Sequence, residues 1–132
     1  MSDRLTPINP ESLARPRGYS HGMKGNGDLL FVAGQVGWDR HGQMVPGDFA
    51  AQFAQALDNV LDVVWKAGGT PQSVARLLIY VTDKAEYRRL VKEVGVAYRA
   101  RMGKHYPAMV LVEVKSLLED DAKVEIEATA IL

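Results

Sequence analysis

The chain has 132 residues, of which 47% are hydrophobic, and its 16 basic side chains balance its 16 acidic ones. This length and composition suit a single globular domain over residues 1–132, and the absence of a charge excess gives no support to sequence-independent nucleic-acid binding. The sequence contains no cysteine, which excludes disulfides, thiolate catalysis and thiolate metal sites.

Residues 1–16 combine charged side chains with prolines and contain no apolar run, so we expect an extended N-terminal segment and no signal peptide. No stretch of the chain approaches the ~20 consecutive apolar residues that a membrane-spanning helix needs. We therefore expect a cytoplasmic protein without a membrane-embedded part.

Two β-strands are predicted before the first helix. Residues 29–36 form a largely apolar run, and residues 18–23 precede it across the turn-like residues 24–28, which contain two glycines. This pattern favours a β-hairpin. The glycine spacing is wrong for a phosphate-binding loop, and no helix follows it.

The first helix is predicted to follow Asp48, a residue type that caps helix N-termini, and to stop at Gly68 and Gly69. Its apolar face consists of Phe53, Leu57, Val60, Leu61 and Val64.

The second helix is predicted to begin at the capping-box pair Asp83 and Glu86 and to end at Gly103. Its apolar stripe consists of Tyr87, Leu90, Val91, Val94, Tyr98 and Met102.

Three further strands are predicted, one between the helices at residues 74–82 and two after them at residues 108–114 and 123–132. The last alternates most clearly, with apolar side chains at every second position from Val124 to Ala130. With one further short strand expected between residue 36 and the first helix, the order is three strands, a helix, a strand, a helix and two strands, which is typical of the α+β class.

The strand at residues 108–114 is apolar on both faces, since Met109 and Leu111 point to one face while Val110, Val112 and Val114 point to the other. Two helices cover only one face of a sheet of five or six strands. A second copy of the chain is the economical cover for the other face, so we expect an oligomer.

The three histidines, His21, His41 and His105, show no metal-ligand spacing and are accompanied by no thiolate, so we expect no metal site. Ser20 and His21 are neighbours in a predicted strand and point to opposite faces, which excludes them as a catalytic pair.

Glu125 and Glu127 share one face of the last strand. Paired carboxylates serve as acid and base in many enzymes, but two carboxylates on an exposed strand are also the ordinary solvated side of a sheet. The residue pattern alone does not reveal a reaction.

Short motifs along the chain resemble those of the RidA/YjgF family, in order and with similar spacing from about residue 18 to residue 131. They are GYSHG at residues 18–22, LFVAGQV at 30–36, ALDNV at 56–60, AGG at 67–69, YVTD at 80–83, YPA at 106–108, VEV at 112–114 and VEIEATA at 124–130. Each motif alone is unspecific; the ordered set is specific.

The resemblance implies a chorismate-mutase-like fold, with one mixed sheet and two helices on one face, that assembles as a homotrimer. It also implies small-molecule clefts between subunits and hydrolysis of reactive enamines and imines, such as 2-aminoacrylate, to keto acids and ammonia without a cofactor. By the same resemblance, Glu125 is the candidate catalytic residue. The candidate ligand-binding residues are Tyr19, Ala33, Gly34, Met109 and Leu111.

The sequence departs from the family pattern at Met109, because the resembling motif carries an arginine there that holds the substrate carboxylate. Methionine donates no hydrogen bond and carries no charge. Leu118 also stands where the family has a proline, and one residue is inserted before Glu125. We therefore expect a cleft without the arginine that usually binds the substrate carboxylate. Arg17 and Lys104 are the first residues to consider as its replacement.

Three functional hypotheses remain. The chain is an imine or enamine deaminase whose substrate is anchored differently, or it is a binding module that holds a small molecule without turnover. The third hypothesis, a ribonuclease, is not supported by the balanced charge or by the arrangement of the histidines. Nucleic acid is not an expected partner.

Overall fold

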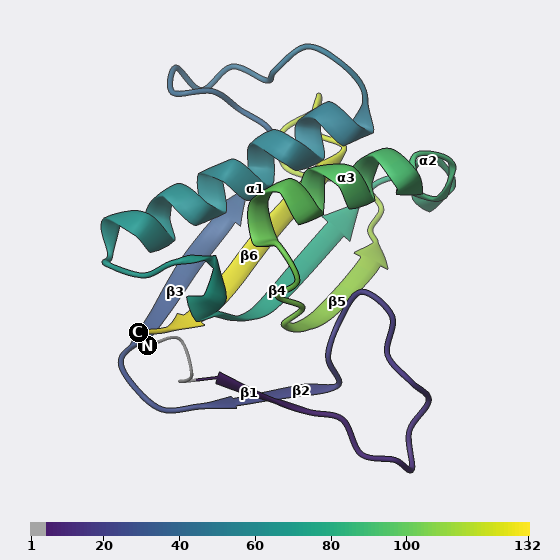
Figure 1. Cartoon of the computed structure of the whole chain (residues 1–132). Coiled ribbons are helices and arrows are strands. Elements are labelled where there is room, and N and C mark those ends of the chain that lie inside the picture. The colour runs from purple at the N-terminus through teal and green to yellow at the C-terminus, as the bar shows by residue number, and fades with distance from the viewer. Residues whose placement is uncertain (1–4) are drawn as a thin grey trace.

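A four-stranded mixed sheet carries both long helices on one of its faces (Figure 1). The computed structural model describes residues 5–132. The sheet order is β3 (Leu29–Gln35), β6 (Val124–Ile131), β4 (Val74–Val81) and β5 (Ala108–Glu113). Only β4 and β5 are parallel. The α+β prediction, with one mixed sheet and helices on one face, is confirmed, although the main sheet has four strands and not five or six.

The segment before β3 forms a separate two-stranded hairpin of β1 (Leu5–Ile8) and β2 (Gly22–Gly25). The expected hairpin between residues 18–23 and residues 29–36 is therefore wrong. β3 pairs with β6 on one side and is an edge strand of the sheet, and Asp28 and Leu132 exchange two backbone hydrogen bonds of 2.9 and 2.8 Å at the end of β6. The backbone of Gly27 also packs so closely on Leu132 that a Cβ would overlap its carbonyl oxygen, and the chain leaves the sheet there.

The extended segment expected at residues 1–16 is partly regular, because β1 lies within it; its first four residues lie outside the described part of the chain. The stretch between β1 and β2 is connected to the main sheet through Ser20. Its backbone bridges to Ala108 at the start of β5, and its hydroxyl donates to the carbonyl of Tyr106 at 2.6 Å.

Helix α1 (Phe49–Lys66) begins and ends as the sequence predicts. The carboxylate of Asp48 accepts a hydrogen bond from the N–H of Ala51 at 3.1 Å, which satisfies one of the free donors of the first turn. At the other end, Gly68 has a φ of +94° and Gly69 donates to the carbonyl of Val64 at 2.9 Å, the hydrogen bond of a Schellman motif.

The second predicted helix is interrupted at Leu90, which separates α2 (Lys84–Arg89) from α3 (Val91–Met102). Asp83 caps α2 by accepting from the N–H groups of Ala85 and Glu86 at 3.0 and 3.3 Å. At Leu90 the backbone leaves the helical region with φ −104° and ψ 18°. The expectation of one continuous helix from Asp83 to Gly103 is therefore wrong, while its two ends are confirmed.

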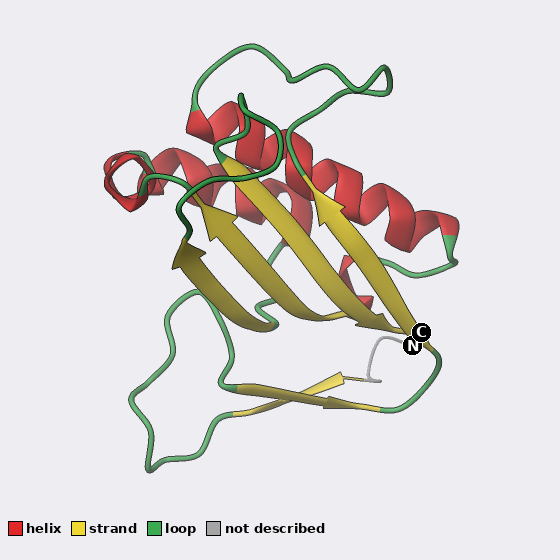
Figure 2. Cartoon of the chain, turned by 180° about the vertical axis from the view of Figure 1, so that it is seen from behind, coloured by secondary structure: helices red, strands yellow, loops and turns green. Residues whose placement is uncertain are grey.

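The hydrophobic core lies between the helices and one face of the sheet. α1 contributes Phe49, Phe53, Leu57, Val60 and Val64, and the strands contribute Leu77, Ile79, Val81, Val124 and Ile126. The short helix η1 (Pro71–Ser73) connects α1 to β4. Seen from behind, the other face of the sheet has no helix over it (Figure 2).

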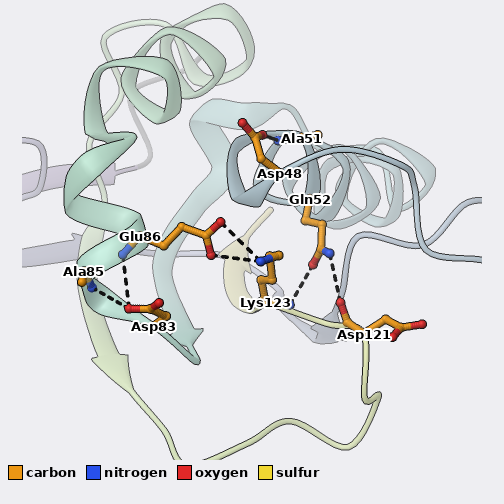
Figure 3. A network of polar contacts seen from close by, with 8 residues as sticks. All are labelled: Asp48, Ala51, Gln52, Asp83, Ala85, Glu86, Asp121 and Lys123. Atoms are coloured by element: carbon orange, nitrogen blue, oxygen red, sulfur yellow. Dashed lines mark hydrogen bonds and ion pairs between the residues drawn. The ribbon is translucent and has the colours of Figure 1, made fainter.

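Polar contacts hold the helices to the strand end at Lys123 (Figure 3). Gln52 of α1 is 4% exposed, and its amide donates to the carbonyl of Asp121 at 3.0 Å and accepts from the N–H of Lys123 at 2.7 Å. The Lys123 ammonium lies 3.1 Å from the carboxylate of Glu86 on α2. These contacts set the entry of β6, which carries Glu125, relative to both helices.

Within residues 5–132, no helix combines the length and the apolar content that crossing a membrane would require.

Candidate functional site

The strand register assigns the candidate residues to opposite faces of the sheet. Met109 of β5 pairs with Leu77 of β4, whereas Glu125 of β6 pairs with Tyr80 of β4. Leu77 and Tyr80 are three positions apart in one strand, so their side chains point to opposite faces. Met109 therefore lies on the face that the helices cover, and Glu125 lies on the face that they leave open.

A cavity of about 290 Å³ lies on the helix-covered side, between α3 and the β5 edge of the sheet. Its lining is aromatic and aliphatic, with one charged side chain, Arg99. The lining residues are Gly18, Phe53, Ile79, Tyr87, Val91, Val94, Gly95, Tyr98, Arg99, Tyr106, Met109 and Leu111. A mainly apolar pocket with a single charged group suits a small organic ligand that carries one opposite charge.

Two stacked tyrosines form one wall of this pocket. The rings of Tyr98 and Tyr106 are 5.5 Å apart and nearly parallel, at 9°. The hydroxyl of Tyr98 donates to the carbonyl of His105 at 2.6 Å, and burial of this ring raises the pKa of Tyr98 above its usual value. Tyr98 therefore stays neutral and fixes the position of Tyr106 beside Met109.

Arg99 is the pocket residue that the sequence analysis missed. It lies four positions after Gly95 and eight after Val91, so the three residues form one row along α3. Arg17 and Lys104, the replacements suggested from the sequence, do not line the pocket. No local sequence signal identifies Arg99 as a pocket residue, because its place there depends on how α3 packs over β5.

The open face carries two carboxylates with different surroundings. Glu127 accepts a hydrogen bond from the Tyr80 hydroxyl at 2.8 Å, and this bond to a carboxylate raises the pKa of Tyr80. The Glu125 carboxylate lies against the backbone of Gly34, where an added Cβ would overlap it. Glu125 makes no ion pair or side-chain hydrogen bond with the other residues between 5 and 132, so its oxygens remain available to water or a ligand.

Large apolar side chains share the open face with these carboxylates. Phe31 is 74% exposed, and Leu29, Val110 and Val112 are also exposed. All four alternate with side chains that point to the core, so they belong to the face without helices. Exposed apolar side chains gathered on one face are typical of a surface that another molecule covers.

The six predicted site residues therefore separate into groups. Met109 and Leu111 line the pocket, whereas Ala33 and Glu125 lie on the open face and Gly34 contacts Glu125. The expectation of one cleft wall that includes both Met109 and Glu125 is wrong for a single chain, because strand alternation places them on opposite faces.

Tyr19, the sixth predicted residue, lies before β2 and follows the pocket residue Gly18. Its ring meets the ring of His21 edge-on, with 5.3 Å between the centroids.

Two of the histidines are engaged by backbone carbonyls. His21 contacts the carbonyl of Ala14 at 2.6 Å, and His105 contacts that of Val74 at 2.7 Å. Across the described residues, no group of three or more histidine, aspartate or glutamate side chains is placed to bind a metal ion.

Comparison with known proteins identifies the family of this chain. A family model described as Endoribonuclease L-PSP matches residues 10–132. The chain belongs to this family, the RidA/YjgF family. The family resemblance predicted from the short motifs is thereby confirmed.

Other RidA/YjgF proteins are similar over most of the chain. A RutC family protein of Pyrococcus horikoshii is 36% identical over 125 residues, which cover 93% of this chain and 94% of that protein. A protein of Escherichia coli K12 named 2-iminobutanoate/2-iminopropanoate deaminase is 33% identical over 108 residues, or 80% of each chain.

Solved structures of the family share the fold. A Rid family protein of unknown function, YyfB from Yersinia pestis, aligns with a TM-score of 0.85 and 36% identity, covering 98% of this chain and 99% of that chain. The YjgF structure from E. coli aligns with a TM-score of 0.67 and 31% identity, covering 96% of this chain and 98% of that one.

Proposed function

We propose that this protein hydrolyses reactive enamines and imines to carbonyl compounds and ammonia, in clefts between the subunits of a homotrimer. Membership of the RidA/YjgF family supports the proposal, as does the similarity to a protein named as an iminobutanoate and iminopropanoate deaminase. The observation that carries it is the position of Glu125, a carboxylate held over the Gly34 backbone with no hydrogen-bonding or ion-pair partner among residues 5–132.

Hydrolysis of an imine, R₂C=NH + H₂O → R₂C=O + NH₃, consumes only water. A carboxylate within hydrogen-bond reach of that water accepts its proton as the oxygen attacks the imine carbon, and returns the proton to the departing nitrogen. Glu125 is the group to which we assign this role. Glu127 is less suited, because the Tyr80 hydroxyl already occupies one of its oxygens.

The trimer is part of the proposal because one chain does not bring the pocket and Glu125 together. Met109 and Leu111 face the helices while Glu125 faces away from them, so a cleft that contains both needs two chains. The exposed apolar side chains on the same face as Glu125 supply the surface through which a second copy would pack.

The test compares Glu125→Gln with the native protein and with Glu127→Gln, a matched change two residues along the same strand face. The imine is generated with an amino-acid oxidase, and its remaining amount is measured by trapping with semicarbazide. We expect Glu125→Gln to lower the hydrolysis rate by about 100-fold or more, and Glu127→Gln to have little effect. Equal rates in the native and Glu125→Gln proteins would exclude this role of Glu125.

A second candidate function is a binding module without turnover. It is favoured by the apolar lining of the pocket, where Met109 occupies the position at which the family resemblance implies an arginine. Under this hypothesis the native protein binds small molecules but leaves the trapped imine signal unchanged.

RNA cleavage, which the name of the family model mentions, receives no support from the site. The formal net charge is +0, and the side chains of His21 and His105 are both engaged by backbone carbonyls. A nucleic-acid-binding surface ordinarily carries clustered positive charge.

A further inference from the structure

Arg99 is the one charged side chain among the described residues that line the pocket at the β5 edge. It forms no ion pair and no side-chain hydrogen bond with other residues between 5 and 132, unlike Arg101, whose guanidinium binds Asp58 at 2.7 Å. A positive charge without a partner beside an apolar cavity attracts an anion, and a guanidinium suits a carboxylate because its donors form a planar fork.

The helix itself makes room for this guanidinium. Gly95 lies one turn before Arg99, and a Cβ at Gly95 would be 3.2 Å from Arg99 Nη1. Glycine inside a helix is unfavourable, and Gly95 has no positive φ that would require it. The missing side chain instead lets Arg99 extend back along α3, over the mouth of the pocket.

The opposite wall offers the apolar part of a binding site. Met109 and Leu111 of β5 are half-buried against the core, and the stacked ring of Tyr106 lies next to them. A cavity of about 290 Å³ accommodates a ligand of a few heavy atoms. The positive charge of Arg99 at one end of the pocket and the apolar wall at the other suit an organic acid with a short apolar chain.

From this arrangement we propose that Arg99 binds the carboxylate of a small organic acid whose apolar chain lies against Met109 and Leu111. The residue that binds the carboxylate would then lie on helix α3, and not on strand β5 where the family resemblance implies an arginine. The proposal rests on the proposed function in one respect, the assignment of this acid as a 2-imino acid.

The test uses 2-oxobutanoate, a stable acid of this size, together with its uncharged amide. Binding is followed by NMR of protein labelled with ¹³C at the methionine methyl groups, with the Met109 signal assigned through Met109→Leu. We expect 2-oxobutanoate to shift the Met109 signal and to bind about tenfold more tightly than the amide, which corresponds to about 1.4 kcal/mol.

Arg99→Met removes the charge and keeps the length of the side chain. It should weaken 2-oxobutanoate binding by about tenfold while leaving amide binding unchanged. Arg99→Lys should keep part of the affinity, because lysine keeps the charge without the fork. Arg89→Met is the matched control, since Arg89 is exposed on α2 and does not line the pocket.

Three results would overturn the proposal: equal affinity for acid and amide, unchanged acid binding by Arg99→Met, or no shift of Met109 at tens of millimolar acid. The semicarbazide assay on the same samples distinguishes failure of the Arg99 proposal from failure of the proposed hydrolysis. Acid binding through Arg99 without imine hydrolysis would support the anchor and reject the enzyme. Hydrolysis that Arg99→Met leaves intact would support the enzyme and reject the anchor.

Discussion

Met109 contacts the pocket from the strand side, opposite Arg99 on the helix. We expect Met109→Arg to increase hydrolysis of 2-aminoacrylate-type imines, because a desolvated charge pair with the substrate carboxylate contributes on the order of 2–5 kcal/mol. Met109→Leu keeps the volume without the charge and should leave the rate unchanged. Initial rates in the semicarbazide assay measure both effects.

The double variant Arg99→Met, Met109→Arg tests this prediction further, because it moves the one guanidinium among the described pocket-lining residues from the helix to the strand. We expect it to recover much of the rate that Arg99→Met loses. The arginine at position 109 should also lower the thermal midpoint, since Met109 packs against the core and the new charge is partly buried without a ligand. A double variant as slow as Arg99→Met would argue against a carboxylate at this site.

At this scale, two residues that line the pocket were predicted from the sequence, and its charged residue, Arg99, was missed. Met109 and Leu111 were reached through the family motif, and both line the cavity. Arg99 lies in no motif, and its stripe was interpreted only through its apolar members. Its proximity to Met109 depends on how α3 packs over β5, which no local pattern contains.

At the scale of elements, helix α1 is joined to the segment before β6 by one buried side chain, Gln52. Gln52, which is itself 4% exposed, binds two backbone groups of the segment before β6, the carbonyl of Asp121 and the N–H of Lys123. We expect Gln52→Leu to lower the free energy of unfolding by about 1–3 kcal/mol, because the two hydrogen bonds of the buried Gln52 amide are lost. Urea denaturation followed by circular dichroism measures the change.

Gln55→Leu is the control on the same helix. Its amide binds only Asn59, whose own amide remains bound to the carbonyls of Val36 and Trp38. A loss below about 1 kcal/mol is expected for this variant. Equal losses for the two variants would show that the buried contacts at Lys123 are not what makes Gln52 important.

The elements themselves were largely predictable, and the errors have local causes. Asp48, Gly68 and Asp83 marked helix ends correctly because capping depends on nearby backbone groups. The break at Leu90 was missed because the apolar stripe continues through it. The hairpin was misassigned because β2 pairs with β1, while β3 pairs with β6, almost a hundred residues away.

The whole molecule leaves one face of its sheet without cover, and we expect it to assemble as a homotrimer in solution. Phe31→Asp should shift the mass measured by light scattering toward the monomer, because Phe31 is 74% exposed in the single chain and would bring a charge into the interface. The far-ultraviolet circular dichroism should not change, since Phe31 is outside the core.

Leu118→Asp is the matched control for assembly. Leu118 is 92% exposed in the loop between β5 and β6, away from the strands of the open face. We expect this variant to keep the native mass. A native protein that is monomeric at micromolar concentration would end the trimer prediction.

The sequence indicated the second apolar face, because Val110 and Val112 alternate with Met109 and Leu111 in one strand. It did not indicate how the site residues divide between the faces. That division depends on the register between β4 and both of its neighbours, which long-range pairing sets.

The placement of Arg99 and Glu125 on opposite sides of the sheet has a genetic consequence. If each site takes Arg99 from one copy and Glu125 from the next, two inactive proteins can complement each other. Co-expressed Arg99→Met and Glu125→Gln chains would form mixed trimers with one intact site each, which is about a quarter of all sites when equal amounts of the two chains assemble at random. Each variant alone has none, so activity that reappears only when the chains assemble together would mark a site shared between neighbours.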